Sequence, residues 1–172
     1  VLDGPFKGLQ LKQDISWGAL DISSMLLGNY ELNVQKRISS VVHQQQKIFV
    51  DLGAADGFFA CGCAAFFDFK KVISFEINPK SRKVQAEIAK LNNIKNLEIR
   101  AEIDKQILID LLSNTEQKCV FLIDLEGFET DLLDNDVLQL MQGHELIVEL
   151  HEMNGKLVEL TAKLIERLKM FF

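Results

Sequence analysis

The sequence predicts a doubly wound α/β domain built on a mostly parallel β-sheet. Short runs rich in Val, Ile and Phe alternate with longer stretches of helical period, and no long linker or low-complexity tract separates them. The clearest run, residues 47–52, is continuous and apolar up to its end, as expected of a strand buried on both faces. Alternation of this kind gives a parallel sheet with right-handed crossovers.

Five runs are predicted to be strands because they are short and bear β-branched or aromatic side chains. In chain order they are 47–52, 72–77, 97–101, 120–124 and 146–151. The third run is the weakest of the five. We find no internal repeat, so the five strands are expected to form one sheet.

Helices are predicted between these strands and before the first of them. Asn78 can cap the helix after the second strand, and Pro79 can occupy its first position, where the missing N–H costs nothing. The other helices are predicted where apolar residues recur every three or four positions: 32–41, 57–67, 107–112, 132–140 and 157–168.

Length and composition indicate one globular domain of 172 residues, 48% hydrophobic and 26% charged. We expect residues 1–45 to form an N-terminal segment and helix packed on the core, and residues 46–172 to form the binding domain.

The net charge of −6 argues against a phosphate-backbone binder, so no nucleic-acid partner is expected. The three cysteines fit no disulfide framework and are expected to be buried and reduced. No stretch is long and apolar enough to predict a membrane span and no signal peptide is evident, so a cytoplasmic location is expected.

A glycine-rich turn follows the first predicted strand, at residues 51–57. Gly53 and Gly57 let the backbone turn tightly and approach a ligand. The second strand ends in Glu76, 25 residues after Asp51, where a carboxylate can accept hydrogen bonds from both ribose hydroxyls. Ligands of doubly wound sheets bind outside the carboxyl ends of the strands, so these residues predict a nucleoside site.

The residues of the turn distinguish between two kinds of nucleoside cofactor. A dinucleotide loop needs G-x-G-x-x-G, whereas here Ala55 stands between two glycines spaced Gly53-x-x-x-Gly57. Asp51 and Asp56 would repel a pyrophosphate, but they suit the sulfonium and ammonium groups of S-adenosylmethionine. The predicted cofactor is therefore S-adenosylmethionine. Its candidate binding residues here are Asp51, Gly53, Ala55, Gly57, Glu76 and Asn78. A dinucleotide-dependent oxidoreductase and a non-catalytic nucleoside-binding module are the alternatives.

Four ionisable residues lie at the ends of the fourth and fifth strands: Asp124, Glu126, Glu149 and His151. Strand alternation predicts that Asp124 and Glu126 share one side, and that Glu149 and His151 share a side of the fifth strand. Ionised groups in central strands are costly to bury without partners, so a shared polar cleft explains them better than separate sites. One carboxylate could pair with the ammonium of the methyl donor. His151 is the first candidate for the general base, and Asp124 or Glu149 is the next. Asp124, Glu126 and Glu149 could also hold a divalent cation, although nothing in the spacing requires one. His151 could instead be a capping or surface residue, and Glu126 with Glu129 could serve only the dipole of the next helix.

Four segments resemble the FkbM-type class I methyltransferases in order and spacing: 50–59, 75–79, 123–129 and 147–151. The D-x-E-G-x-E stretch followed by V-E-L-H is the more specific part, because all class I enzymes share the glycine loop. The resemblance runs from about residue 26 to residue 152. It implies a seven-stranded sheet and O-methylation of a hydroxyl, often on a sugar or secondary metabolite.

The same resemblance implies roles for single residues. Asp51, Gly53 and Gly57 would line the methyl donor and Glu76 would bind its ribose, while the amino-acid end of the donor would lie near Asp124 and Glu126. The five predicted strands leave out the last β-hairpin of such a sheet, so the domain is expected to be C-terminally incomplete. The sequence therefore predicts methyl transfer from S-adenosylmethionine to a hydroxyl of a small molecule or saccharide.

Overall fold

The computed structural model describes residues 1–13, 21–42, 47–151 and 157–172. Five strands form one sheet in the order β3-β2-β1-β4-β5, and every neighbouring pair is parallel. The strands are β1 (Lys47–Leu52), β2 (Phe69–Phe75), β3 (Leu97–Arg100), β4 (Cys119–Ile123) and β5 (Glu145–Val148). The order reverses between β1 and β4, which places a topological switch point there. The predicted doubly wound parallel sheet is confirmed.

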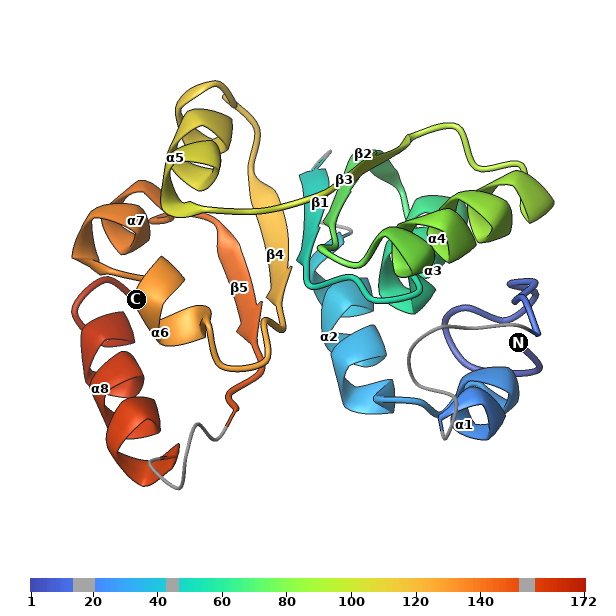
Figure 1. The fold of residues 1–172 in the computed structure, drawn as a ribbon, viewed down its shortest axis with the longest axis horizontal. Coiled ribbons are helices and arrows are strands. Elements are labelled where there is room, and N and C mark those ends of the chain that lie inside the picture. Colours follow the sequence, from blue (N-terminus) through green and yellow to red (C-terminus); the bar gives the residue numbers. More distant parts are fainter. Residues whose placement is uncertain (14–20, 43–46, 152–156) are drawn as a thin grey trace.

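Helices cover both faces of the sheet (Figure 1). Their bounds are α1 (Ile22–Leu27), α2 (Leu32–Val42), α3 (Phe58–Phe66), α4 (Pro79–Leu91), α5 (Lys105–Ser113), α6 (Glu129–Leu132), α7 (Asn135–Leu140) and α8 (Leu157–Leu168). The N-terminal segment, α2, α3 and α4 pack on one face, and α5 to α8 pack on the other. None of the helices in the described ranges has the length and apolar character that crossing a membrane requires.

The two apolar cores follow from the period of the strands. Successive residues of β1 point to opposite faces, so Phe49 joins the core under α3 and α4, while Val50 joins the core under α5 to α8. Both side chains are fully buried, and β4 is buried along its whole length. A central strand buried on both faces is what the continuous apolar run predicts.

The N-terminal segment packs on the first of these cores. The Phe6 ring is fully buried and lies edge-on to the Phe58 ring of α3, with centroids 5.4 Å apart. The side chain of Asn92, at the end of α4, donates to the Gln10 carbonyl at 2.8 Å and accepts from its N–H at 2.9 Å. This segment therefore shares the core of the sheet.

Three details differ from the predicted elements. The helix expected at 132–140 is two short helices, because the side chain of Asp134 accepts from the Val137 N–H at 3.0 Å and starts α7 afresh. Helix α1 was not predicted. Strands β4 and β5 end at Ile123 and Val148, so the acids and the histidine at the end of the sheet lie in loops rather than in strands.

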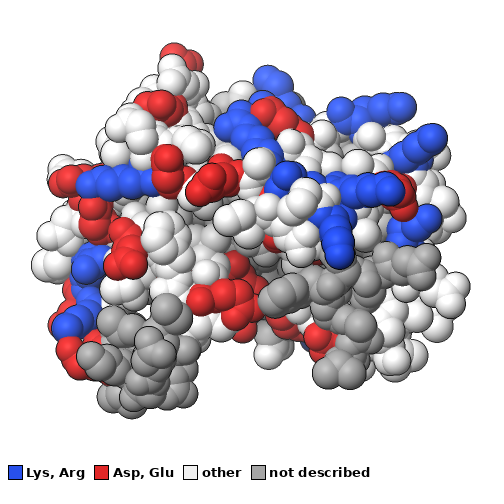
Figure 2. All heavy atoms as spheres, in the orientation of Figure 1, with Lys and Arg blue, Asp and Glu red and all other residues white. Residues whose placement is uncertain are grey.

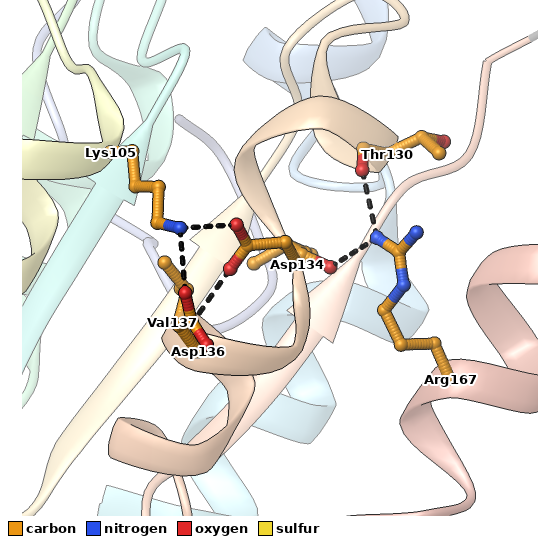
Figure 3. Close-up of polar contacts among 7 residues, drawn as sticks. Lys105, Thr130, Asp134, Asp136, Val137 and Arg167 are labelled. Carbon is orange, nitrogen blue, oxygen red and sulfur yellow. Dashed lines mark hydrogen bonds and ion pairs between the residues drawn. The ribbon is translucent and has the colours of Figure 1, made fainter.

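Polar contacts join the helices on the second face (Figure 3). Lys105, at the start of α5, bridges the carboxylates of Asp134 and Asp136. Arg167 of α8 donates to the backbone carbonyls of Thr130 and Leu133 at 2.9 and 2.6 Å. These contacts fix α6, which directly follows the loop after β4.

Candidate functional site

A cavity of about 620 Å³ opens at the carboxyl ends of the strands. Its volume lies in the range of small-molecule sites, roughly 300–1,000 Å³. Eight of the predicted site residues line it: Asp51, Gly53, Ala55, Glu76, Asn78, Asp124, Glu126 and Glu149. Gly57 and His151 are not among the lining residues. The structure therefore brings most of the site residues that were predicted from the sequence together in one cavity.

The turn after β1 fits closely against the end of β4. Gly53 has a φ of +89°, and a Cβ at this position would lie 1.7 Å from the Asp124 carbonyl oxygen. The Asp124 N–H donates to the Leu52 carbonyl at 2.9 Å, which keeps the two strand ends together. A side chain at position 53 would force β1 and β4 apart.

Glu76 holds the next part of the turn by its carboxylate. The N–H of Ala55 donates to Oε2 of Glu76 at 2.8 Å, and the N–H of Asn78 donates to Oε1 at 2.7 Å. Ala55 has a φ of 45°, a left-handed conformation that non-glycine residues adopt only when their surroundings hold them in it. Each Glu76 oxygen keeps a free lone pair, so the carboxylate can still accept from ribose hydroxyls.

Gln85 of α4 supports the same turn from beneath, and the sequence reasoning missed it. Its Nε2 donates to the Ala55 carbonyl at 2.7 Å, and its Oε1 accepts from the Ser74 hydroxyl at 2.7 Å. The side chain is fully buried. A signal was present, because position 85 lies on the apolar face of α4 with Val84 and Ile88, where an unpaired amide would be costly.

The end of β2 is fixed from the first turn of α4. The side chain of Asn78 caps the helix by accepting from the Lys80 N–H at 2.9 Å, as predicted. Arg82 donates to the carbonyls of Glu76 and Ile77, both at 2.7 Å. Glu76 is therefore held at its carboxylate and at its backbone.

Asp51 is a buried acid with an unsatisfied oxygen. Its side chain lines the cavity at 2% exposure, and Oδ2 has no hydrogen-bond partner. Burial, followed by repulsion from Asp124, raises the pKa of Asp51 to about 8. Such a group favours a ligand that brings a positive charge or a donor.

Asp124 has the same character at the end of β4. Its Oδ1 is buried without a hydrogen bond. Burial raises the pKa of Asp124 to about 7, with further repulsion from Glu149 and Glu126 and an opposing effect of His151. Neutral and ionised forms of Asp124 are therefore both populated near pH 7.

His151 lies among carboxylates behind this wall of the cavity. Its Nε2 is 3.5 Å from Oδ1 of Asp124, 3.7 Å from Oε1 of Glu149 and 3.8 Å from Oε2 of Glu126. Burial lowers the pKa of His151, but its hydrogen bond with Glu129 and the charges of the surrounding acids raise it more, so the net shift is upward. A raised pKa favours the protonated ring, and a protonated ring cannot accept a proton.

Glu129 organises the loop after β4 and was considered from sequence only as a helix-dipole residue. It is 2% exposed, and its Oε1 accepts from the N–H groups of Leu125 and Gly127 at 2.8 and 3.2 Å. The same oxygen lies 3.2 Å from Nδ1 of His151. Asp124, Glu129 and His151 could place ligand atoms within 4.8 Å of one another. The Glu129 oxygen already has these partners, so the cluster needs no cation.

Tyr30 and Glu31 bring the N-terminal region into the cavity, and neither was a predicted site residue. The Tyr30 ring packs edge-on against Phe58 at 5.4 Å. Glu31 has a φ of 41°, and burial raises its pKa against the opposing effect of a hydrogen bond with Tyr30. Strained residues that line a cavity are typical of functional sites.

The match to known families decides the class of this site. A model of the TRM5/TYW2 methyltransferase domain matches residues 16–170. The chain belongs to this family. A search of curated proteins finds no match. Membership in a methyltransferase family favours the predicted methyltransferase over the dinucleotide-dependent and non-catalytic alternatives.

Several solved structures share the fold. TYW2 of M. jannaschii in complex with AdoMet has a TM-score of 0.52 at 19% identity, covering 92% of this chain and 64% of that one. A proposed rRNA methylase from Clostridium thermocellum has a TM-score of 0.58 at 14% identity, covering 79% and 78%. A ribosomal protein L11 methylase from Lactobacillus delbrueckii subsp. bulgaricus has a TM-score of 0.53 at 16% identity, covering 92% and 74%. The chain spans 35% to 66% of the length of several other structures that it matches.

The cofactor is S-adenosylmethionine, as predicted. The cavity fits this group, since Asp51 and Asp124, each with a buried oxygen that lacks a hydrogen bond, are among the acids that line it and would suit a cationic, phosphate-free donor. The FkbM family is not shown, because the match is to TRM5/TYW2 enzymes.

The expectation that no nucleic acid is a partner is wrong. TRM5 and TYW2 are tRNA methyltransferases, and one of the similar structures is described as an rRNA methylase. The net charge misled because it averages two unlike parts. Residues 1–100 contain 13 Lys and Arg against 10 Asp and Glu, whereas residues 101–172 contain 6 against 15.

Proposed function

We propose that this chain is the catalytic domain of an S-adenosylmethionine-dependent methyltransferase whose acceptor is RNA. The observation that carries the proposal is the cavity of a TRM5/TYW2 domain, in which the Glu76 carboxylate lies together with Asp51 and Asp124, each of which has a buried oxygen without a hydrogen bond. The acceptor class comes from the family and from the charge separation along the chain.

The donor-binding roles are assigned to the end of the sheet around β1, β2 and β4. When bound, S-adenosylmethionine supplies an electrophilic methyl group on a sulfonium. Glu76 accepts hydrogen bonds from the ribose, and Asp51 faces the positive charge with its unpaired oxygen. The remaining donor-binding residues are Gly53, Ala55, Gly57, Asn78 and Glu126, which shape the turn and the wall of the cavity.

Asp124 is the best candidate for the general base. It lines the cavity, and a carboxyl with a pKa of about 7 can take a proton near neutral pH. His151 becomes a positioning residue, because its raised pKa and its place behind the cavity suit a charge partner for Asp124. Glu149 lines the cavity and is the second candidate base.

The rim of the cavity supports a base as the group that enters it. Ile77 is 74% exposed and Phe128 is 45% exposed, and both line the opening. The flat Phe128 ring can stack on an unpaired base, a contact worth about 1–3 kcal/mol per base, and Ile77 adds apolar surface beside it. RNA recognition of this kind uses bases that are splayed out of the strand.

One observation favours a second candidate, the sugar or secondary-metabolite hydroxyl that the FkbM resemblance implied. Glu102, Asp104 and Glu149 line the cavity together with the acids already described. Such a lining disfavours phosphates and accepts a neutral hydroxyl compound more readily.

The main proposal also includes the division of the chain into residues 1–45 and 46–172. It includes a cytoplasmic location as well, which is in keeping with three free buried cysteines.

The test is transfer of a tritiated methyl group from S-adenosylmethionine. The purified chain is incubated with unmodified transfer RNA transcripts, ribosomal RNA, and a panel of sugars and nucleosides. We expect ribonuclease-sensitive label on RNA and its loss in Asp124→Asn. Label on sugars and none on RNA would replace RNA by the second candidate, and tight binding of NAD without S-adenosylhomocysteine would overturn the donor.

A further inference from the structure

We propose that the outer face of α4 docks the phosphate backbone of the RNA acceptor beside the cavity. We call this surface the α4 basic face and define it by Lys80, Lys83 and Lys90. The inference rests on the proposed function, since it names the surface that holds the proposed acceptor.

The periodicity of α4 places these three lysines together. The helix buries the side that bears Ser81, Val84, Gln85 and Ile88. The lysines recur at intervals of three and seven residues on the opposite side, and all three are exposed. In Figure 2, Lys and Arg atoms gather over the part of the molecule where Figure 1 draws α4, and Asp and Glu atoms dominate over α5 to α7.

The charges of this face are available to a partner. Within the described part of the chain, no ion pair is recorded for any of the three lysines. Glu87, the acid of α4, pairs instead with Lys12 at 3.2 Å. Glu98, on neighbouring β3, is held between Lys71 and Arg100. Glu87 lies on the same side of α4 as Lys83 and Lys90, and its pairing with Lys12 leaves these lysines without an ion pair in the described part of the chain.

The position of the face suits a strand of RNA whose base enters the cavity. Asn78, which lines the cavity, directly precedes α4. From Lys80 to Lys90 the helix rises about 15 Å at 1.5 Å per residue, enough to follow several phosphates. Because the cavity lining itself is acidic, the backbone is better held beside the opening than over it.

The experiment compares two charge-matched triple variants of the whole chain. Lys80→Gln/Lys83→Gln/Lys90→Gln removes the α4 basic face, and Lys118→Gln/Lys163→Gln/Lys169→Gln removes three exposed lysines elsewhere. Affinity for a fluorescein-labelled transfer RNA transcript is measured by anisotropy between 0.05 and 0.2 M salt. Three lost phosphate contacts should weaken binding by about tenfold or more and reduce the log–log salt slope by about 2 to 3.

The control triple should bind RNA within about twofold of wild type, and both triples should bind S-adenosylhomocysteine as wild type does. If the wild type methylates RNA and the two triples lose RNA affinity equally, the docking surface is overturned and the proposed function stands. If the wild type neither binds nor methylates RNA, the proposed function fails first. Circular dichroism checks that both triples keep the wild-type fold.

Discussion

The two halves of the cavity are built on opposite principles. At the ends of β1 and β2, the polar groups that shape the turn have partners, from the Glu76 carboxylate with its two backbone N–H donors to the Gln85 amide. At the ends of β4 and β5, and at Asp51 of β1 beside them, carboxylates repel one another, and Asp51 and Asp124 each keep a buried oxygen without a hydrogen bond. Under the proposed function, the first half is preformed for the nucleoside, whereas the second is completed by a cationic ligand.

The two halves should therefore differ in how substitutions affect the stability of the fold and the function of the site. Paired groups around the turn stabilise the fold and the donor site together, so changes there should damage both. Repelling acids destabilise the folded chain, so their removal should stabilise it and still damage function. The following predictions test that contrast, in order of the expected effect on donor binding or turnover.

The largest effect is expected for Gly53→Ala in the preformed half. A Cβ would meet the Asp124 carbonyl oxygen at 1.7 Å, and φ is +89°. We expect donor binding to be lost in calorimetry with S-adenosylhomocysteine, and the free energy of unfolding to fall by about 2–4 kcal/mol. Gly143→Ala is the matched control, because its φ is +84° and its Cβ would meet nothing within 4 Å. Equal losses in the two variants would mean that backbone strain, and not the contact with β4, explains position 53.

Asp124→Asn tests the half that a ligand completes. As the proposed base, its loss should lower the turnover rate by about 100-fold or more, while the affinity for S-adenosylhomocysteine changes less. The thermal midpoint should rise at pH 8, because repulsion between Asp124 and Asp51 is removed. His151→Asn should cost only a few-fold in turnover. A larger loss in His151→Asn than in Asp124→Asn would restore the histidine as base.

The contrast also predicts a dependence on pH. Asp51 and Asp124 have pKa values of about 8 and about 7, above the ordinary 3.8. The folded chain therefore holds protons that the unfolded chain has released, and its stability falls as pH rises from about 5 to 8. The raised pKa of His151 acts in the same direction above its ordinary value of 6.5. Midpoints in thermal melts at several pH values, without ligand, check this.

A cationic ligand should reverse that trend. Binding favours the ionised acids, so affinity for S-adenosylmethionine, which carries the sulfonium, should rise about tenfold between pH 6 and 8, as expected for one carboxyl with a pKa near 7. The rise should be weaker in Asp124→Asn. An affinity that is flat over this range in the wild type would show that these acids do not face the ligand.

The sequence predicted the sheet better than it predicted the site. Runs such as β1 need only local pattern, and Asn78 with Pro79 marked the start of α4 correctly. Gly53 and Glu76 were also predicted to lie together, because both stand directly at strand ends, and the structure brings both to the cavity. Both predictions depend on signals from neighbouring residues.

The missed parts depend on contacts across the chain. Gln85 meets Ala55 from 30 residues away, and Tyr30 and Glu31 reach the cavity from the region before β1. Strand alternation could not place Glu126, because β4 ends at Ile123 and Glu126 has a φ of 52°. The net charge concealed the basic half of the chain for a similar reason, since a total carries no information on position.

The smallest of these effects is expected for Gln85→Leu. This change removes two hydrogen bonds that support the turn after β1, and residue 85 does not line the cavity. The Ala55 carbonyl and the Ser74 hydroxyl would lose their partners in a buried place, costing about 1–3 kcal/mol of stability. The turn keeps its bond to Glu76, so affinity for S-adenosylhomocysteine should fall only about three- to fivefold. Gln106→Leu, on the exposed side of α5, should leave both quantities unchanged.

The double variant Ser74→Ala/Gln85→Leu separates the two losses, because it removes the unpaired hydroxyl but leaves the Ala55 carbonyl. It should regain part of the stability and none of the donor affinity, and full recovery of affinity would mean that Gln85 supports the core of α4 rather than the turn.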